Sequence, residues 1–342
     1  MIKFLGSKKK LLSTIYEASI EGFNGDVETV IDIFSGTSRV GHYFKSKGHR
    51  VISNDYSNFA KALAECYVVA DRGKYIDDAQ KLVDEYNSDK SICRNGWFAD
   101  QYCYRSRFFK PKNGYRVDWI RDDLESKSLD PILKSIMLTS LMKAADAVDS
   151  TCGVQMAYLK EWAERSNKDL FLKVPDLLPA SPYGNCEAHK GTAESKSAVL
   201  QADLVYLDPP YNQHSYLGNY HIWESLVLWD KPDTYGVAHK RVDTRENKSE
   251  FNGKHKALPA MTKVIENLSK NTKRAVVSYS NEGYISYRDM LTLLASHGKT
   301  VVYEIDYKRY VGALIGVYND KGVKVGKPTH TDNKEYIFVT DF

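Results

Sequence analysis

Residues 27–38 read VETVIDIFSGTS, and this stretch decides the fold class of the chain. The β-branched and apolar residues up to Phe34 are typical of a buried strand. Serine and threonine then surround a glycine, and they are good caps for a helix that is expected to begin at about Arg39. A lysine followed by Gly48 should end that helix, because cations and a glycine suit a helix C-terminus.

The segments that follow continue this alternation of strand and helix. A second short strand is expected at 50–53 and a further helical segment at 56–69. The order strand, helix, strand, helix over residues 27–70 predicts the start of a parallel, doubly wound α/β sheet. The other elements expected beside this sheet are strands at 204–207, 274–280, 300–307 and 335–340, and helices after residue 8 and at 219–229, 258–270 and 285–297.

The stretch 73–185 has a different character. Helical patterns recur in it, and several prolines break the chain before the next expected strand. We therefore predict two domains, in which residues 1–72 and 186–342 form the sheet domain and residues 73–185 form an inserted, mostly helical domain. The helical stretches expected in the insertion lie near 75–86, 129–146 and 153–166.

Composition narrows the classes of protein further. No apolar run among the 342 residues approaches the ~20 residues that span a bilayer, and the first residues lack the apolar stretch of a secretory signal. A cytoplasmic protein without membrane contact is expected. The five cysteines are scattered and never spaced as close pairs, which argues against a disulfide framework and against a structural zinc. The net charge of +4 is small, so its distribution matters more than its total.

Basic and aromatic side chains alternate within residues 94–121. One interpretation is a nucleic-acid surface, with cations for phosphates and rings for stacking. The other is a small aromatic core with a solvated basic rim, and this segment alone does not distinguish the two. Residues 239–256 are also polar and basic, which indicates an exposed loop and a second candidate for facing DNA.

Residues 203–211, DLVYLDPPY, lead from a buried strand into a polar turn. Asp208 lies at the carboxyl end of that strand, where open α/β sheets build their sites. The prolines at 209 and 210 fix the backbone and carry no N–H, so nearby carbonyls point rigidly outward. With the ring of Tyr211, these groups suit a planar amine such as that of a base turned out of a duplex. The alternative is a strand that simply ends in a proline turn. Polar residues that follow and could line the same pocket are Asn212, Gln213, His214 and His221.

The turn after the first strand is a second candidate site. Gly36 lets a ligand approach the backbone closely, and Asp55, at the end of the next strand, is placed to bind ribose hydroxyls. The glycine fingerprint of dinucleotide sites is absent, and a nucleoside without phosphates does not need it. The turn therefore favours S-adenosylmethionine over a nicotinamide dinucleotide. Near the start of the chain, Lys8 follows a Gly-Ser turn and is expected to face a ligand carboxylate, with an exposed basic tail as the alternative.

Four motifs in this order resemble the α-group of adenine-specific DNA methyltransferases. They are Phe4-Leu5-Gly6-Ser7-Lys8, Asp32-Ile33-Phe34-Ser35-Gly36-Thr37, Asn54-Asp55 and Asp208-Pro209-Pro210-Tyr211. Residues 113–121, and residues 145–148 together with 151–153, also look like segments of those members that serve restriction–modification systems. The resemblance covers most of the chain. It departs at Ser38, where the family usually has a glycine, and this bears on how closely the backbone can approach a ligand there.

The resemblance implies a role for each matching residue. The cofactor-binding set is Phe4, Lys8, Asp32, Phe34, Gly36, Asp55 and Asp208. The catalytic set that takes the target base is Asp208, Pro209, Pro210 and Tyr211. Within the inserted domain, the candidates for contacts to phosphates or guanines are Arg105, Arg107, Arg116 and Arg121. Neither a metal nor a cysteine nucleophile is expected.

The implied fold is a Rossmann-like S-adenosylmethionine-dependent methyltransferase sheet with an inserted target-recognition domain. The implied reaction moves a methyl group from S-adenosylmethionine to the 6-amino group of a flipped adenine in double-stranded DNA, leaving S-adenosylhomocysteine. A restriction–modification role makes a separately acting restriction endonuclease a candidate partner. The alternatives are methylation of another amino group (in cytosine, RNA or a protein glutamine), a DNA-binding relative without catalysis, and a nicotinamide oxidoreductase.

Overall fold

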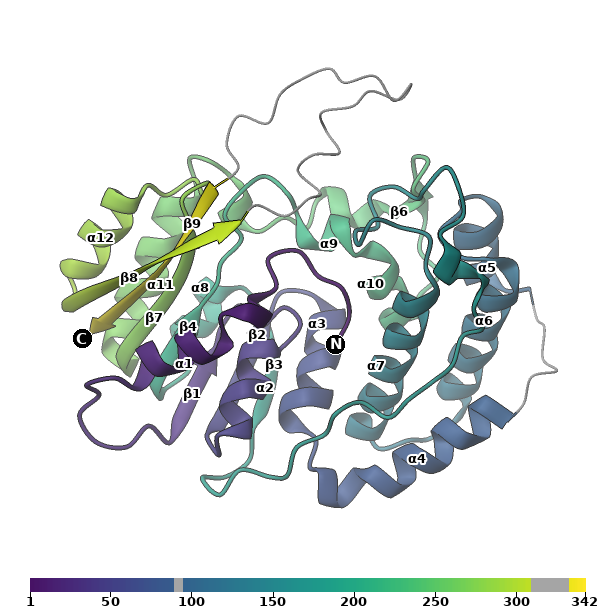
Figure 1. Cartoon of the computed structure of the whole chain (residues 1–342), viewed down its shortest axis with the longest axis horizontal. Coiled ribbons are helices and arrows are strands. Elements are labelled where there is room, and N and C mark those ends of the chain that lie inside the picture. The colour runs from purple at the N-terminus through teal and green to yellow at the C-terminus, as the bar shows by residue number, and fades with distance from the viewer. Residues whose placement is uncertain (89–94, 309–331) are drawn as a thin grey trace.

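The structure is a computed structural model that describes residues 1–88, 95–308 and 332–342. A seven-stranded sheet occupies one side of the molecule and a group of helices the other (Figure 1). The strand order is β3-β2-β1-β4-β7-β9-β8. The strands are β1 (Thr29–Asp32), β2 (Arg50–Asp55), β3 (Glu187–Lys190), β4 (Ala202–Leu207), β7 (Thr272–Ser280), β8 (Lys299–Lys308) and β9 (Asp332–Asp341). A separate two-stranded ribbon pairs β5 (Thr234–Tyr235) with β6 (Lys240–Arg241).

Strand direction places a crevice at the middle of this sheet. Strands β3, β2, β1, β4 and β7 are parallel, and β9 runs antiparallel to both of its neighbours. From β1 the chain continues to β2 on one side, while β4 pairs with β1 on the other, with Asp32 opposite Tyr206. Such a reversal of strand order opens a crevice at the carboxyl ends of the two central strands. The predicted doubly wound α/β class is confirmed.

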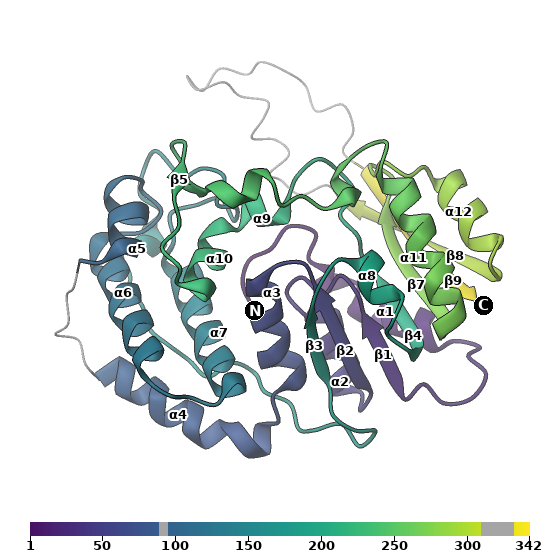
Figure 2. The same ribbon diagram turned by 180° about the vertical axis from the view of Figure 1, so that it is seen from behind.

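Alternating side chains divide the sheet into two buried faces. Val30 and Leu204 point to the face covered by α1 (Leu12–Ile20) and α2 (Arg39–Ser46). Their neighbours Ile31 and Val205 point to the opposite face, which is covered by α8, α11 and α12. Figure 2 shows that second set of helices in front of the strands. Its members are α8 (Ala193–Ser197), α11 (Ala257–Asn271) and α12 (Tyr287–Ala295).

The helical region forms the largest apolar cluster and joins the sheet through α3 (Asn58–Ala64). Phe59 and Leu63 of α3 are buried in the same cluster as Met137 and Trp223, which lie on two helices of that region. The other helices of this side are α4 (Arg72–Ser88), α5 (Trp97–Ala99), α6 (Pro111–Ser126), α7 (Pro131–Val148), α9 (Tyr216–Asn219) and α10 (His221–Leu228). In the described ranges, no helix has both the length and the apolar character needed to cross a lipid bilayer.

Some local predictions were wrong or incomplete. The helix expected at 153–166 is absent from these described residues, because their backbone bonds go to distant partners: Gln155 N–H donates to Asn219 O at 2.8 Å, and Leu159 N–H to Ser150 O at 2.9 Å. Helix α6 and strand β3, which is a short and mostly polar edge strand, were not predicted from the sequence. The division into residues 1–72 with 186–342 and residues 73–185 stays a prediction.

Candidate functional site

A cavity of about 240 Å³ opens where β1 and β4 end, at the carboxyl edge of the parallel strands. Gly36 and Asp208 both line it, so the turn after β1 and the turn after β4 face the same space. The sequence-predicted residues that line this cavity are Phe4, Lys8, Asp32, Phe34, Gly36, Asp55, Asp208 and Pro210. The sheet therefore brings together residues that are up to about two hundred positions apart in the chain.

The turn between β1 and α2 needs its glycine. Gly36 has a φ of +49°, in the left-handed region that favours glycine. Its N–H donates a hydrogen bond of 2.9 Å to Asp55 Oδ2 at the end of β2. A Cβ atom at this position would lie 3.4 Å from the ring of Phe4. That distance is an ordinary van der Waals contact, so the backbone conformation and not a lack of space is what favours glycine here.

Two buried carboxylates flank this turn. Asp32 Oδ2 accepts a hydrogen bond of 3.1 Å from Gly41 N–H, and Asp32 Oδ1 is buried with no partner among the described residues. Burial raises the pKa of Asp32 to about 8. Asp55 Oδ1 accepts hydrogen bonds from Ser57 N at 3.0 Å and from Ser57 Oγ at 2.9 Å. Burial raises the pKa of Asp55, although these hydrogen bonds act in the opposite direction.

Ser38 has a left-handed backbone conformation, which the glycine usual at this position in the family would adopt without strain. Its φ is +58° and its ψ is +26°, and the residue is fully buried. Its Oγ has no hydrogen-bond partner within the described part of the chain. A residue with a Cβ in this region of φ and ψ is strained by about 1–2 kcal/mol. The departure at Ser38 thus leaves the turn intact at some expense of stability.

Replacing Ser38 with glycine should therefore stabilise the protein. We expect Ser38→Gly to raise the free energy of unfolding by roughly 1 kcal/mol. The strain energy that is relieved in the folded state exceeds the extra entropic cost of ordering a glycine on folding. Urea denaturation monitored by circular dichroism would measure the change. Ser269, within the regular helix α11, is the matched control, and Ser269→Gly should destabilise by about 1 kcal/mol or less. Loss of stability in both variants would contradict this account of Ser38.

Lys8 lies between two carboxylates at the floor of the cavity. Lys8 Nζ is 3.2 Å from Asp208 Oδ1 and 2.5 Å from Glu335 Oε1. Lys8 and Glu335 are each 8% exposed, whereas the Asp208 side chain keeps 24% exposure because it faces the cavity. The Asp208 carboxylate can thus still accept hydrogen bonds from a ligand in the cavity, while the ammonium group of Lys8 pairs with it from the protein side. Sequence reasoning missed Glu335 entirely.

The three groups shift the proton affinity of one another. Burial by itself would lower the pKa of Lys8, but the carboxylates of Asp208 and Glu335 outweigh burial and raise that pKa well above its ordinary value. Burial raises the pKa of Asp208 to about 6; Lys8 lowers it and Glu335 raises it further. Lys8 therefore stays charged at neutral pH, and the Asp208 carboxyl group is mainly ionised there.

Aromatic rings form one wall of the cavity, but Tyr211 is not among the described residues that line it. The half-buried ring of Tyr211 makes an edge contact with Tyr279 at 6.5 Å between centroids. Tyr216 lines the cavity instead and stacks on Phe4, with 4.9 Å between centroids and 7° between planes. Phe4 in turn stacks on Tyr220 at 4.6 Å. Sequence reasoning missed Tyr216, although its place soon after Asp208 was a signal.

The polar residues after Tyr211 lie elsewhere than expected. The four residues that were candidates for lining the pocket do not line it: Asn212, Gln213, His214 and His221. His221 is fully buried, and its Nε2 lies 3.0 Å from Gln155 O within the helical region. Burial lowers the pKa of His221 to about 3, so this ring is neutral. His221 therefore has a structural role, because its side of α10 faces the interior of the helical region. The cavity wall instead includes residues 191–194, residues 247–250 and Asn252. Among these, Thr192 could have been recognised from the sequence as the cap residue before α8.

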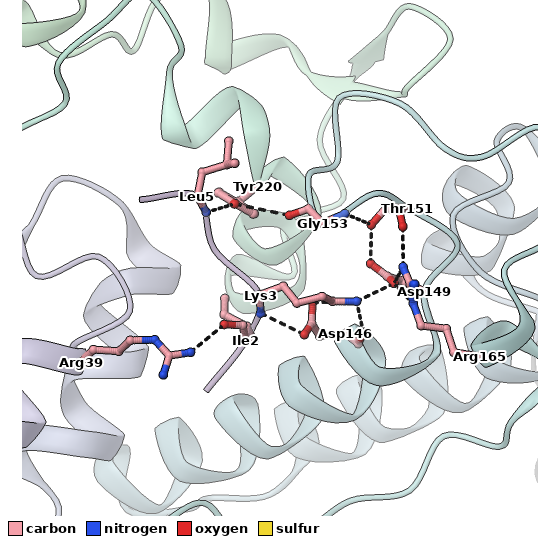
Figure 3. A network of polar contacts seen from close by, with 10 residues as sticks. All are labelled: Ile2, Lys3, Leu5, Arg39, Asp146, Asp149, Thr151, Gly153, Arg165 and Tyr220. Carbon is pink, nitrogen blue, oxygen red and sulfur yellow. Dashed lines mark hydrogen bonds and ion pairs between the residues drawn. The ribbon is translucent and has the colours of Figure 1, made fainter. Parts of the chain in front are cut away.

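The N-terminal segment that carries Phe4 and Lys8 is fixed by the helical region (Figure 3). Lys3 Nζ donates to Asp146 O at 2.6 Å and pairs with Asp149 Oδ1 at 2.9 Å. Asp149 is almost fully buried and also binds Arg165 Nε at 2.8 Å. Two residues further on, Leu5 N–H donates to the hydroxyl of Tyr220 at 2.7 Å. The ring of Phe4 is thus positioned by contacts on both sides of it.

Three arginines that were candidates for DNA contacts lie at least partly at the surface. Arg105 is 60% exposed by its side chain and pairs with Asp100 at 2.8 Å. Arg107 donates to Lys160 O at 2.8 Å and lies over the ring of Trp162. Arg116 is partly buried and donates to Tyr86 O. Arg105 is therefore the most exposed of the three, and DNA contacts by Arg105, Arg107 and Arg116 stay predictions.

Arg121 cannot contact DNA in this fold, so its prediction was wrong. Its side chain is 0% exposed, and its guanidinium donates to the carbonyl oxygen of Leu226 at 2.6 Å and pairs with Glu125 at 2.6 Å. It also lies over the ring of Trp229. These partners join α6 to the end of α10, which makes Arg121 a structural residue.

The aromatic residues of 94–121 mainly build the core of the helical region. Phe98, Tyr102, Phe108 and Phe109 are buried in one cluster, whereas Tyr104 is 54% exposed. Within the described part of this segment, the interpretation as an aromatic core with a basic rim therefore accounts for most of the rings. Their alternation with basic residues reflects packing, since the basic side chains that remain exposed lie around the cluster.

Comparison with known proteins identifies the family. The model of the D12 class N6 adenine-specific DNA methyltransferases matches residues 4–282. The chain belongs to this family. The matched span of the D12 class model contains Lys8, Asp55 and Asp208 together with β1 to β7, and Glu335 lies beyond it.

Curated relatives of the chain include proteins named as type II methyltransferases and as modification methylases. The chain is 29% identical to type II methyltransferase M.FokI of Planomicrobium okeanokoites, over 90% of this chain and 50% of that protein. It is 30% identical to modification methylase StsI of Streptococcus sanguinis, over 90% and 49%. Type II methyltransferase M.NlaIII of Neisseria lactamica is 26% identical, over 90% and 92%. This D12 class chain thus spans about half the length of the first two relatives and nearly all of the third.

Proposed function

We propose that this chain methylates the 6-amino group of adenine in double-stranded DNA, as the modification enzyme of a restriction–modification system. The observation that carries the proposal is the single cavity shared by the Gly36 turn and the Asp208 carboxylate, in a chain of the D12 class. The relatives named as modification methylases support the biological role. A separately acting endonuclease of the same specificity is part of this proposal.

The residues of the cavity fit S-adenosylmethionine as the methyl donor. Bound S-adenosylmethionine supplies an electrophilic methyl group on a positively charged sulfur. Asp55 would accept hydrogen bonds from the ribose hydroxyls. Asp32 Oδ1 and Asn54 Oδ1 are buried polar atoms without a partner among the described residues, as expected of groups that await a polar ligand. Phe4 and Phe34 would pack on its apolar parts.

Asp208 would prepare the amino group of the base. An adenine amine is a poor nucleophile because its lone pair is delocalised into the ring. The Asp208 carboxylate would accept a hydrogen bond from one of the two N–H groups of this amine. The carbonyl of Pro209, a buried residue that is not among those lining the cavity, stays the predicted acceptor for the other, and two such bonds would favour a pyramidal nitrogen. With the donor bound, the nitrogen would take the methyl group and release one proton to water, while the electron pair of the C–S bond would remain on sulfur. Fixed orientation of this kind can be worth roughly 7–11 kcal/mol.

The target base would be held by aromatic rings and by the surrounding loops. Stacking on a flipped base is worth about 1–3 kcal/mol. The role expected of Tyr211 stays a prediction, and Tyr216 is a second ring that could take it because it faces the cavity. We propose that residues 73–185 form the target-recognition domain, with Arg105 and Arg107 toward DNA phosphates or guanines.

The reaction should depend on the ionisation of Asp208. Since the pKa of this carboxyl group is raised to about 6, the rate of methyl transfer should fall as the pH drops through about 6, where the acceptor becomes protonated. Single-turnover rates between pH 5 and pH 8 would measure this, with DNA and donor binding followed over the same range as controls. A rate that stays constant well below pH 6 would contradict the role of Asp208.

Transfer of a radiolabelled methyl group tests the function itself. Purified protein and labelled S-adenosylmethionine are incubated separately with duplex DNA, RNA and protein, and the products are digested to nucleosides and amino acids. We expect N6-methyladenine from DNA. N4-methylcytosine, a labelled RNA nucleoside or a labelled glutamine would replace the proposed substrate, and donor binding without transfer would indicate a DNA-binding relative.

A further inference from the structure

A third charged residue completes the pair of Lys8 and Asp208. Glu335 lies near the start of β9, opposite Ser280 of β7. Because β9 is antiparallel to the central strands, its beginning lies at the edge of the sheet where those strands end. Its side chain shares a face with Ile337, which packs toward α1 and α2, and this is the face from which Lys8 approaches. The geometry of the sheet thus delivers a carboxylate to the site from outside the span of the family model.

The resulting cluster holds one ammonium between two carboxylates. Lys8 Nζ is closer to Glu335, at 2.5 Å, than to Asp208, at 3.2 Å. A lysine paired with Asp208 alone would neutralise the carboxylate and occupy its acceptor positions. With Glu335 as the nearer partner, Lys8 is satisfied without full engagement of Asp208, and the ionised cluster keeps one negative charge in excess.

That excess charge matters when the methyl group moves. As the N–C bond forms, positive charge passes from sulfur to the amino nitrogen, which is bound to Asp208 in the proposed reaction. A nearby cluster with net negative charge stabilises this shift, and a neutral Lys8–Asp208 pair would do so much less. The charge supplied by Glu335 would therefore act on the transition state more than on binding of the base.

We propose that Glu335 is a positioning residue for methyl transfer: it holds Lys8 partly away from Asp208, so that the Asp208 carboxylate stays free toward the amino group and the cluster as a whole carries a net negative charge. This inference rests on the proposed function. Glu335 is not one of the residues that line the cavity, and it acts through Lys8.

Several other groups influence Asp208 and bear on any pH test. Lys8 opposes protonation of Asp208, and Glu335 favours it. The hydroxyl of Tyr206 is occupied, since it donates to Ser278 Oγ at 2.9 Å. Titratable residues that interact with Asp208 from the elements around it are Lys8, Asp32, Tyr206, Tyr211, Tyr216 and Glu335.

The first test compares kcat among three variants. Glu335→Gln keeps the shape of the side chain, leaves Lys8 its ion pair with Asp208, and should lower kcat for transfer to DNA by about ten- to a hundredfold with little change in KM. Glu335→Asp keeps the charge on a shorter side chain and should fall between wild type and Glu335→Gln. Glu304→Gln, which removes the partner of Lys334 at the exposed surface of β8, is the matched control and should behave as wild type. Wild-type kcat in both Glu335 variants would overturn the proposal.

A second readout does not depend on activity. The Asp208 carboxyl carbon is followed by NMR in protein with ¹³C-labelled aspartate, and its signal is assigned with Asp208→Asn. In Glu335→Gln the titration of Asp208 should move to lower pH, since a like charge has been removed, and the acid limb of the rate profile should move with it. An unchanged titration in a folded variant would overturn the inference about Glu335. If wild-type protein shows the shifted Asp208 titration but methylates no DNA, the proposed function fails instead.

Discussion

Replacing Asp208 with asparagine is expected to lower kcat for methyl transfer by about a hundred- to a thousandfold, while DNA binding stays close to wild type. Asparagine has nearly the same shape, but it lacks the charge and presents an amide donor where the target amine needs an acceptor. Lys8 keeps Glu335 as its nearer partner in this variant, so the buried ammonium is not left unpaired. The loss should therefore reflect chemistry and not unfolding.

The strand that carries Asp208 also provides its control. Asp203 lies at the opposite end of β4, where its carboxylate accepts hydrogen bonds of 3.0 Å from Glu28 N–H and Thr29 N–H. Asp203→Asn makes the same chemical change far from the cavity and should leave kcat nearly unchanged. Radiolabelled transfer to DNA gives kcat, and a gel shift gives DNA affinity. Near-normal turnover of Asp208→Asn, or an equal loss in both variants, would refute the catalytic role of Asp208.

The second large effect is on stability. Arg121→Ala should lower the free energy of unfolding by about 2–5 kcal/mol, because it removes a large buried side chain and leaves the carbonyl oxygens of Leu226 and Val227 without their donor at the junction of α6 and α10. The guanidinium is fully buried, so water cannot replace these contacts. Urea denaturation would measure the change.

Arg105 is the matched control within the same helical region. Its ion pair with Asp100 is exposed, and such pairs contribute about 0–1 kcal/mol, so Arg105→Ala should hardly change stability. If Arg105 contacts a phosphate, this variant should also weaken DNA binding and reduce its dependence on salt. Equal destabilisation by Arg121→Ala and Arg105→Ala would contradict the expectation that the buried contacts of Arg121 contribute more to stability than the exposed ion pair of Arg105.

The position of residues at strand ends made much of the site predictable. Gly36, Asp55 and Asp208 each follow an apolar strand, and parallel strands bring their carboxyl ends to one edge. Glu335 escaped this reasoning because it stands at the beginning of a strand. It reaches the same edge only because β9 is antiparallel to the central strands. The direction of such a distant strand depends on the topology of the whole sheet, which local sequence patterns do not reveal.

Burial of polar and charged residues was the other feature beyond prediction. An arginine in a basic segment is usually exposed, yet Arg121 is buried because main-chain carbonyls from a helix about a hundred residues later accept its hydrogen bonds. His221 likewise turned inward toward Gln155. For residues 153–166, long-range hydrogen bonds overrode the local pattern that indicated a helix. Each difference arises from partners distant in sequence, which local periodicity does not contain.

The anchoring of the N-terminal segment joins two parts of the molecule mechanically. Lys3 forms hydrogen bonds with Asp146 and Asp149 of the helical side, and the adjacent Phe4 lies against the Gly36 turn of the sheet side. Asp146 Oδ2 also accepts a hydrogen bond of 3.0 Å from the backbone N–H of Lys3, one residue before Phe4. The position of the Phe4 ring in the cavity wall therefore depends on the packing of α7, so a substitution that displaces the end of this helix should also disturb the cavity.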